Sequence, residues 1–177
     1  MRTYVIYGLL IALATAVLTY TEFFLGYHND PAKFAAGSSI GTLGGPLLLI
    51  LGLVLGIRTV RKKRPDRSLS YGRGVLAGTA IGFFAGLFGA ISIFIYGTVV
   101  NPGFHQLLRE RISAEIDAMG LPEQQAEIAE GLIGVFTSAP VIAFFQLIAT
   151  TIFACVLSLV IAAFLKRAPA AEPPPLH

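Results

Sequence analysis

Charged residues fall in clusters along this chain, and the long stretches between the clusters contain none. Four such stretches cover residues 3–21, 34–57, 74–108 and 131–165, with lengths of 19, 24, 35 and 35 residues. A helix needs about 20 mostly apolar residues to cross the hydrocarbon layer of a bilayer. The pattern therefore predicts four transmembrane helices over residues 4–25, 36–57, 74–100 and 140–165.

Glycines recur at every fourth position in the third predicted helix. They are Gly74, Gly78, Gly82 and Gly86, and a similar series in the second predicted helix contains Gly41, Gly45, Gly52 and Gly56. Small residues at this spacing let two membrane helices approach each other backbone to backbone. We therefore expect the two glycine faces to pack together in an antiparallel hairpin, as a glycine zipper.

Polar residues return between the third and fourth predicted helices, over residues 101–139. Apolar residues follow helical spacing from Phe104 to Met119, which predicts an amphipathic helix that ends at Gly120. Pro122 and the acid that follows it start a second helix. The segment is a cap over the bundle, a docking element for a partner, or a solvated connector, and its amphipathic pattern favours the cap.

Composition supports a membrane protein, because 55% of the residues are apolar and only 13% are charged. A soluble domain carries about 25% charged residues. We expect one all-α, polytopic transmembrane domain over residues 1–167 and a disordered Pro/Ala-rich tail over residues 168–177. The first apolar run continues past the Ala14-Thr15-Ala16 triplet to Leu25, so it predicts an uncleaved anchor rather than a signal peptide.

Lys and Arg residues are concentrated on one side of the predicted bundle. The loop between the second and third helices holds seven: Arg58, Arg61, Lys62, Lys63, Arg64, Arg67 and Arg73. Arg2, Lys166 and Arg167 share that side if the spans alternate, and Lys33, Arg109 and Arg111 lie on the other. Because cytoplasmic loops are enriched in cations, both termini should be cytoplasmic and residues 101–139 should face outward.

The basic loop has two interpretations. The favoured one is a topology signal, and the alternative is contact with anionic lipid headgroups through Arg58, Arg61, Lys62, Lys63, Arg64 and Arg67. Nucleic-acid binding is not expected, since the sequence has no recognisable module and no aromatics interleaved with the cations.

No pattern indicates catalysis, a cofactor or a metal. Cys155 is the only cysteine, and His28, His105 and His177 are too scattered to predict a metal site. The sequence therefore predicts a protein that is not an enzyme.

One candidate polar cluster lies in the outer half of the predicted bundle. Glu22 is the only acid in or beside a span, Tyr96 lies near the external end of the third helix, and Gln146 lies in the first turns of the fourth. The favoured interpretation is that Glu22 extends to the interface and Tyr96 is an interfacial aromatic. The alternative is a hydrogen-bonded cluster in an outward-facing cavity, with Glu22 binding a cation or proton.

Short motifs in order along the chain complete the picture. They are Gly56-Ile57-Arg58, Leu69-Ser70-Tyr71-Gly72-Arg73, Ile95-Tyr96, Asn101-Pro102-Gly103-Phe104, Gly120-Leu121-Pro122-Glu123-Gln124-Gln125 and the Leu157 to Ala163 run. The chain thereby resembles the small bacterial membrane proteins grouped as domain of unknown function 4199. Arg58-Thr59-Val60-Arg61 stands where many relatives carry a Tyr-Arg-Asp triplet. The resemblance implies four spans in a bacterial inner membrane and supplies no catalytic residues.

Two functions from different classes follow. The first is a non-enzymatic scaffold or accessory subunit whose outer helical segment contacts a membrane or periplasmic protein. The alternative is a small channel or carrier for an ion, proton or small solute, which needs polar groups facing a cavity within the bundle. An intramembrane enzyme comes third, because no catalytic constellation is present.

Overall fold

The computed structural model describes residues 1–28 and 31–168 of the chain. The predicted proline-rich tail lies, after its first residue, outside the described residues. The elements are α1 (Arg2–Phe24), α2 (Pro31–Lys62), α3 (Tyr71–Ile95), the π-helical turn η1 (Tyr96–Val100), α4 (Phe104–Ala118), α5 (Glu123–Phe136) and α6 (Ala139–Leu165). Four stretches of the described chain are long and apolar enough to cross a membrane: α1, residues 39–62 of α2, α3 with η1, and α6. The prediction of an all-helical membrane protein with four spans is confirmed.

Helix α2 is longer at both ends than predicted. It begins at Pro31, whose fixed backbone angle suits the first turn of a helix. At the other end Arg61 and Lys62 occupy the last turn, where cations interact favourably with the helix dipole. Pro46 lies inside the helix, which continues through it.

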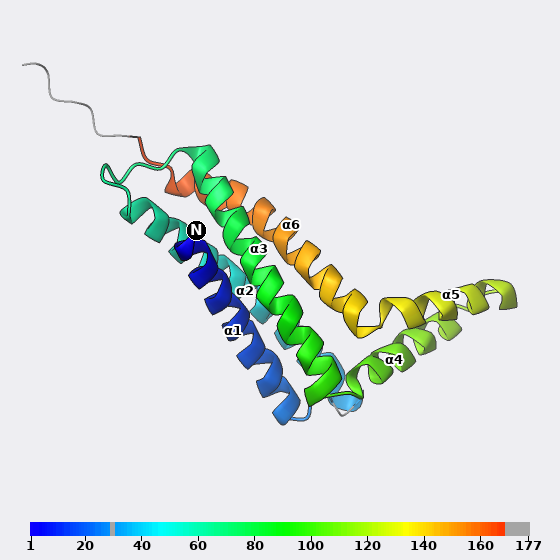
Figure 1. Cartoon of the computed structure of the whole chain (residues 1–177). Coiled ribbons are helices and arrows are strands. Elements are labelled where there is room, and N and C mark those ends of the chain that lie inside the picture. Colours follow the sequence, from blue (N-terminus) through cyan, green and yellow to red (C-terminus); the bar gives the residue numbers. More distant parts are fainter. Residues whose placement is uncertain (29–30, 169–177) are drawn as a thin grey trace, which may run out of the picture.

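Helix α3 lies between α1 and α6, and α2 lies behind them in the view of Figure 1. The most extensive contact in the molecule is between α3 and α6, followed by that between α1 and α3. The N-terminus, the end of α6 and the α2–α3 loop lie at one end of the bundle, which we call the basic end. Helices α4 and α5 leave the opposite end, which we call the hairpin end.

The glycine face of α3 packs against α6 rather than against α2. The pairs are Gly74 with Ala162, Gly78 with Ser158, Gly82 with Ala154, and Gly86 with the backbone of Leu147. The prediction that the two glycine faces contact each other is therefore wrong. The physical reason is that α6 carries its own small residues four apart, so it allows the closer approach.

The glycines of α2 mostly face α1. Gly44 lies against Leu18, Gly52 against Ile11, and Gly56 against both Tyr7 of α1 and Ile81 of α3. Gly41 faces the carboxylate of Glu22, whereas a Cβ at Gly45 would meet nothing within 4 Å. Side chains of α1 therefore pack against the glycines of α2, beside the α3–α6 pair.

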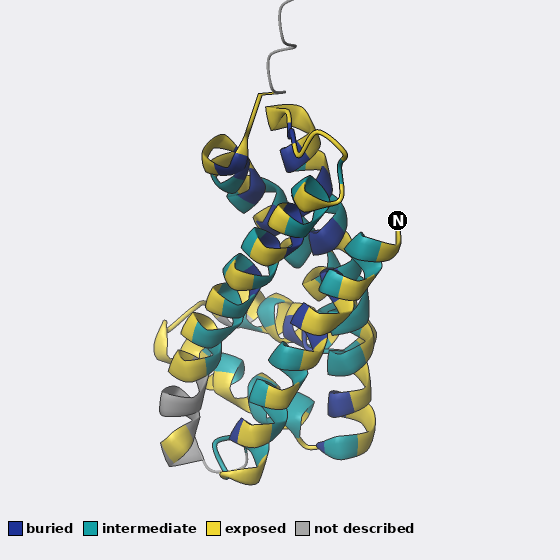
Figure 2. Ribbon diagram, turned by 90° about the vertical axis from the view of Figure 1, so that its left-hand side faces the viewer, coloured by how far each residue is buried: buried dark blue, intermediate teal, exposed yellow. Residues whose placement is uncertain are grey.

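The tightly packed core lies mainly in the half of the bundle near the basic end, where most of the buried residues in Figure 2 gather. Leu53, Ile57, Ile81 and Ser158 are fully buried there. The backbone of Leu69, in the α2–α3 loop, exchanges hydrogen bonds of 2.9 and 3.0 Å with that of Arg167. This bridge fastens the loop to the segment after α6 and closes the basic end.

Helices α4 and α5 form a hairpin that projects sideways from the bundle (Figure 1). Helix α4 contains no buried residue and packs mainly on α5, and Gly120 turns the chain between them with a φ of +62°. The prediction that this segment caps the bundle is wrong. An amphipathic helix needs an apolar neighbour on one face only, and the two helices supply part of that surface to each other.

Candidate functional site

A cluster of polar side chains lies at the hairpin end, where α1 and α3 finish. Glu22 occupies the last turns of α1 and is only 5% exposed. Gly26, with a φ of +82°, then ends the helix: its N–H donates to the carbonyl of Phe23 and that of Tyr27 to the carbonyl of Glu22. The chain reverses at this glycine and places His28 beside Glu22, with 3.3 Å between Nε2 of the imidazole and Oε2 of the carboxylate.

Tyr96, which directly follows α3, contributes the third side chain. It is the first residue of the π-helical turn, in which the N–H of Asn101 donates to the carbonyl of Tyr96 at 2.7 Å. The amide Nδ2 of Asn101 also donates to the Tyr96 hydroxyl at 3.1 Å. The same hydroxyl lies 2.5 Å from Nδ1 of His28. Asn101, placed by the wide turn, and His28, placed by the segment after α1, thus lie within hydrogen-bond distance of the same phenol oxygen.

The donors and acceptors of the cluster fit one proton arrangement. In the arrangement with a neutral imidazole, the Tyr96 hydroxyl accepts from Asn101 and donates to Nδ1 of His28, and the N–H at Nε2 donates to Glu22. Burial lowers the pKa of His28 and so favours this neutral form. In this arrangement the ionisable group that can carry a negative charge is Glu22.

Aromatic rings surround the phenol of Tyr96, which is 1% exposed. The ring centroids of Tyr20, Phe23 and Phe104 lie 5.7, 6.0 and 5.4 Å from its own. The hydrogen bonds of Tyr96 are thereby shielded from competing water, which fixes the position of His28.

One oxygen of Glu22 has no hydrogen-bond partner among the described residues. This atom, Oε1, is buried and points at Gly41 of α2. A Cβ built on Gly41 would lie 3.5 Å from Oε1 and 3.6 Å from Oε2. The absent side chain therefore leaves a space beside the carboxylate that one methyl group would fill.

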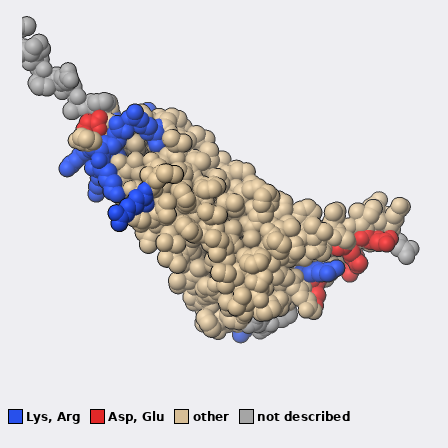
Figure 3. Space-filling model, viewed as in Figure 1, with Lys and Arg blue, Asp and Glu red and all other residues tan. Residues whose placement is uncertain are grey.

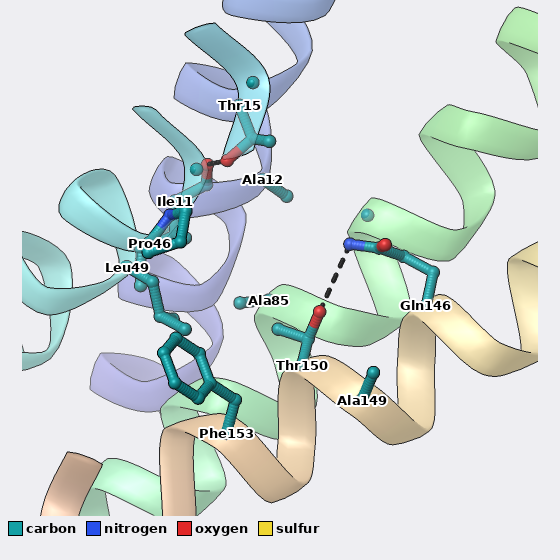
Figure 4. Close-up of a pocket in the computed structure, with 13 residues that line it drawn as sticks. Ile11, Ala12, Thr15, Pro46, Leu49, Ala85, Gln146, Ala149, Thr150 and Phe153 are labelled. Carbon is teal, nitrogen blue, oxygen red and sulfur yellow. Dashed lines mark hydrogen bonds between the residues drawn. The ribbon is translucent and has the colours of Figure 1, made fainter. Parts of the chain in front are cut away.

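Gly41 also lines a cavity of about 380 Å³ between α1, α2, α3 and α6, shown in Figure 4. Its walls are mostly apolar, with side chains such as Ile11, Leu49 and Phe153. Thr15, Thr150 and Gln146 supply polar groups, and Gln146 donates to the Thr150 hydroxyl at 3.2 Å. A smaller cavity of about 120 Å³ is also lined by Thr15 and Gln146, and it reaches Tyr96.

The three residues of the predicted cluster are arranged differently from the prediction. Glu22 and Tyr96 are joined through His28, a residue outside the predicted cluster. Gln146 shares the smaller cavity with Tyr96, but its amide hydrogen bond goes to Thr150 of its own helix. The sequence near His28 offers Gly26, a residue type that can end a helix and reverse the chain, but this does not indicate what His28 contacts.

The basic end carries the predicted cation cluster, visible as the blue patch in Figure 3. Three of its members contact the protein: Arg61 donates to the carbonyl of Leu165 at 3.1 Å, Lys63 donates to the Thr3 hydroxyl at 3.0 Å, and Arg64 lies 3.6 Å from Asp66. Arg58, Lys62 and Arg67 are exposed. Hydrogen bonds from Ser68 lower the pKa of Asp66, with a smaller contribution from Arg64.

Within the described part of the chain, no group of three or more His, Cys, Asp or Glu side chains is placed to hold a metal ion. The ring of His105 packs over Gly97 and lies 5.8 Å from the ring of Phe104.

Comparison with known proteins assigns the chain to a family. Residues 6–167 match the family described as "Protein of unknown function (DUF4199)". No curated protein and no solved structure matches the chain. Because the match covers nearly the whole sequence, the protein belongs to the DUF4199 family, and the resemblance seen in its motifs is confirmed.

Proposed function

We propose that the protein is a non-enzymatic scaffold or accessory subunit of a bacterial inner membrane, and that the α4–α5 hairpin is its contact element. The observation that carries this proposal is the sideways projection of the hairpin from the bundle (Figure 1). A connector between α3 and α6 needs only a few residues, so two helices of 15 and 14 residues require another purpose.

The two faces of the hairpin suit different surroundings. Ile128, Leu132, Val135 and Phe136 form an exposed apolar stripe at helical spacing on α5. The ring of Phe136 lies 5.8 Å from that of Phe145 on α6, so the stripe continues the apolar surface that α6 turns to lipid. This face rests on the membrane surface in our proposal.

Acids dominate the remainder of the hairpin. Exposed members are Glu110, Glu115, Asp117, Glu127 and Glu130, and the red patches of Figure 3 mark this region. An acidic surface held at the membrane attracts a partner segment rich in Lys and Arg. We therefore propose a basic membrane or periplasmic protein as the partner.

The charge distribution supports the orientation. Cations gather at the basic end and acids on the hairpin (Figure 3), and by the positive-inside rule this distribution supports a proposal with both termini in the cytoplasm and the hairpin outside. Arg58, Lys62 and Arg67 are exposed at the cytoplasmic end in this orientation. Each would attract anionic headgroups by about 1 kcal/mol.

Affinity purification in mild detergent with quantitative mass spectrometry tests the scaffold. We expect a stoichiometric partner that is lost from the double variant Glu127→Gln/Glu130→Gln and kept by Asp66→Asn, which removes an acid at the opposite end. A partner retained equally by both variants would contradict a role for the acidic face.

A second candidate, a carrier for a small solute or ion, is favoured by the cavity between α1, α2, α3 and α6, where Thr15, Thr150 and Gln146 supply polar groups. An open channel requires a continuous polar path, whereas Leu53, Ile57 and Ile81 are fully buried in the half near the basic end. A carrier opens at one end of the bundle at a time and needs no continuous path, so the closed half is compatible with a carrier. Flux into liposomes tests it, and we expect Glu22→Gln to abolish the flux.

A further inference from the structure

The cavity between α1, α2, α3 and α6 has the size and shape of a site for part of an extended molecule. Its volume is about 380 Å³, and small-molecule sites commonly enclose about 300–1,000 Å³. On α2 its lining runs from Gly41 to Leu49, about 12 Å of helix at about 1.5 Å per residue. On α6 the lining runs from Gln146 to Phe153, about 10 Å of helix. The space is therefore elongated along the bundle.

The two ends of this space differ in polarity. The end that faces the basic end is apolar, because Ile11, Leu49 and Ala85 belong to the buried core there. Toward the hairpin end, Thr15 and Gln146 line both this cavity and the smaller one that reaches Tyr96. A molecule that matches the space thus has an apolar part at one end and a hydrogen-bonding group at the other.

Gln146 and Thr150 show which hydrogen-bonding group fits. The amide of Gln146 donates to the Thr150 hydroxyl at 3.2 Å, as the dashed line in Figure 4 marks. That bond uses one N–H of the amide, so its second N–H and its carbonyl oxygen are left for a ligand. A ligand hydroxyl both donates and accepts, so it can bond to an amide in either sense.

The lining of the cavity selects against a charged ligand. Among the described residues that line it, none carries a charge. A charged group moved from water into such surroundings is strongly destabilised unless a partner of opposite charge is present. The part of the ligand inside the cavity is therefore uncharged.

The cavity opens sideways between α2 and α6. The lining residues Gln146, Ala149 and Phe153 are exposed on the α6 side, and α2 contacts α6 far less than α3 does. In Figure 4, Pro46 and Leu49 lie across the cavity from Gln146 and Ala149. A molecule dissolved in the bilayer can therefore enter between the two helices without passing through water.

We propose that the cavity binds an uncharged lipid with a hydroxyl-bearing head, such as an acylglycerol. Its hydroxyl lies at Gln146 and Thr150, the part of its chain next to the head lies among Ile11, Leu49 and Ala85, and the remainder passes out between α2 and α6. This inference goes beyond the scaffold and does not require transport. It concerns equilibrium binding, so the absence of a protein partner or of flux leaves it standing.

The experiment uses the full chain in nanodiscs of phosphatidylcholine, a lipid whose headgroup carries no hydroxyl. The probe is a monoacylglycerol with a photoreactive diazirine in its acyl chain near the head, and mass spectrometry locates the cross-links. We expect saturable labelling of the segments 45–49 and 149–153, which contain lining residues. Monooleoylglycerol should displace the probe. Methyl oleate, which has the same chain and no hydroxyl, and oleate, whose head is charged, should not.

Two leucine variants test the two parts of the site. Gln146→Leu nearly keeps the size of the side chain and removes its hydrogen-bonding groups, so binding should weaken at least about fivefold. Gly45→Leu puts a side chain on the cavity wall, where a Cβ meets nothing within 4 Å, and should weaken binding to a similar extent.

Gly72→Leu is the matched control. It makes the same change near the start of α3, where a Cβ also meets nothing within 4 Å, and Gly72 does not line the cavity. This variant should bind the probe as the wild type does. Melting temperatures in the same nanodiscs establish that all three variants fold.

Three results would overturn the proposal. The first is the absence of saturable labelling of the two cavity segments in the wild type. The second is wild-type binding by Gln146→Leu or by Gly45→Leu. The third is displacement of the probe by methyl oleate or oleate as effectively as by monooleoylglycerol, because the site would then recognise an acyl chain alone and not an uncharged hydroxyl head.

Discussion

Ala154 of α6 lies directly on Gly82 of α3, with its Cα only 3.5 Å from the position that a Cβ on Gly82 would take. The Cβ of Ala154 is closer still, so the pair leaves no room for a side chain on α3. This contact lies at the centre of the most extensive helix interface in the molecule.

Replacing Gly82 by leucine should therefore separate α3 and α6. We expect a loss of about 1–3 kcal/mol or more in the free energy of unfolding, as for other overpacked interiors, seen as a lower melting temperature in detergent. Gly82→Ala should have a smaller effect in the same direction. Gly72→Leu is the control on the same helix, since a Cβ there meets nothing within 4 Å. Equal melting temperatures for the two leucine variants would contradict this account.

The second prediction concerns Leu69, whose packing and backbone bridge close the basic end. Leu69 is buried against Ile57 and Leu165, and its backbone is bridged to Arg167. Leu69→Ala should lower the free energy of unfolding by about 2–5 kcal/mol, the range for buried leucines. Leu76→Ala removes the same atoms from a side chain that is 68% exposed and should be nearly neutral. Thermal denaturation of the two variants side by side measures the difference.

The pKa of His28 predicts how stability depends on pH. Burial lowers this pKa below the ordinary value of about 6.5, so the unfolded chain takes up a proton first as the pH falls. Stability contributed by neutral His28 should thus be complete above about pH 6.5 and lost below it. Melting temperatures between about pH 5 and 8 check this.

The variant His28→Gln should flatten that pH dependence. Glu22 and Tyr96 face His28 from α1 and α3, so Glu22→Gln should also change the profile. An identical pH dependence in wild type and His28→Gln would assign the effect to another group.

Orientation in the membrane is tested by reporter fusions. A reporter after Leu165 should report the cytoplasm, and one inserted between Ser113 and Gln125, around the tip of the hairpin, should report the external side. Two fusions on the same side of the membrane would rule out four alternating spans.

The four spans are predictable from sequence because lipid excludes charge so strongly that gaps between charged residues mark the helices. The partner of the glycine face is not predictable in the same way. The glycine spacing indicates that one face of α3 is flat. Ala154, Ser158 and Ala162 make a face on α6 that is as suitable a partner as the glycine face of α2, and the sequence does not show which of the two helices α3 contacts.

Glu22 could be identified from sequence because an acid inside a span is rare and costly. His28 could not, since its contact with Glu22 depends on the reversal at Gly26, and its contact with Tyr96 depends on the wide turn of η1. The hairpin was predicted as two helices, but its direction depends on tertiary geometry at the end of α3.

The π-helical turn at Tyr96 adds one residue to the end of α3. This extra residue sets the direction, around the axis of α3, in which the following chain leaves the helix. The bond in this turn from the Asn101 N–H to the Tyr96 carbonyl spans one residue more than an α-helical bond. Deleting one residue from 97–100 would restore α-helical geometry and rotate the following chain by about 100° around the axis of α3. Asn101 would leave the phenol, and the hairpin would point toward a different neighbour in the membrane plane.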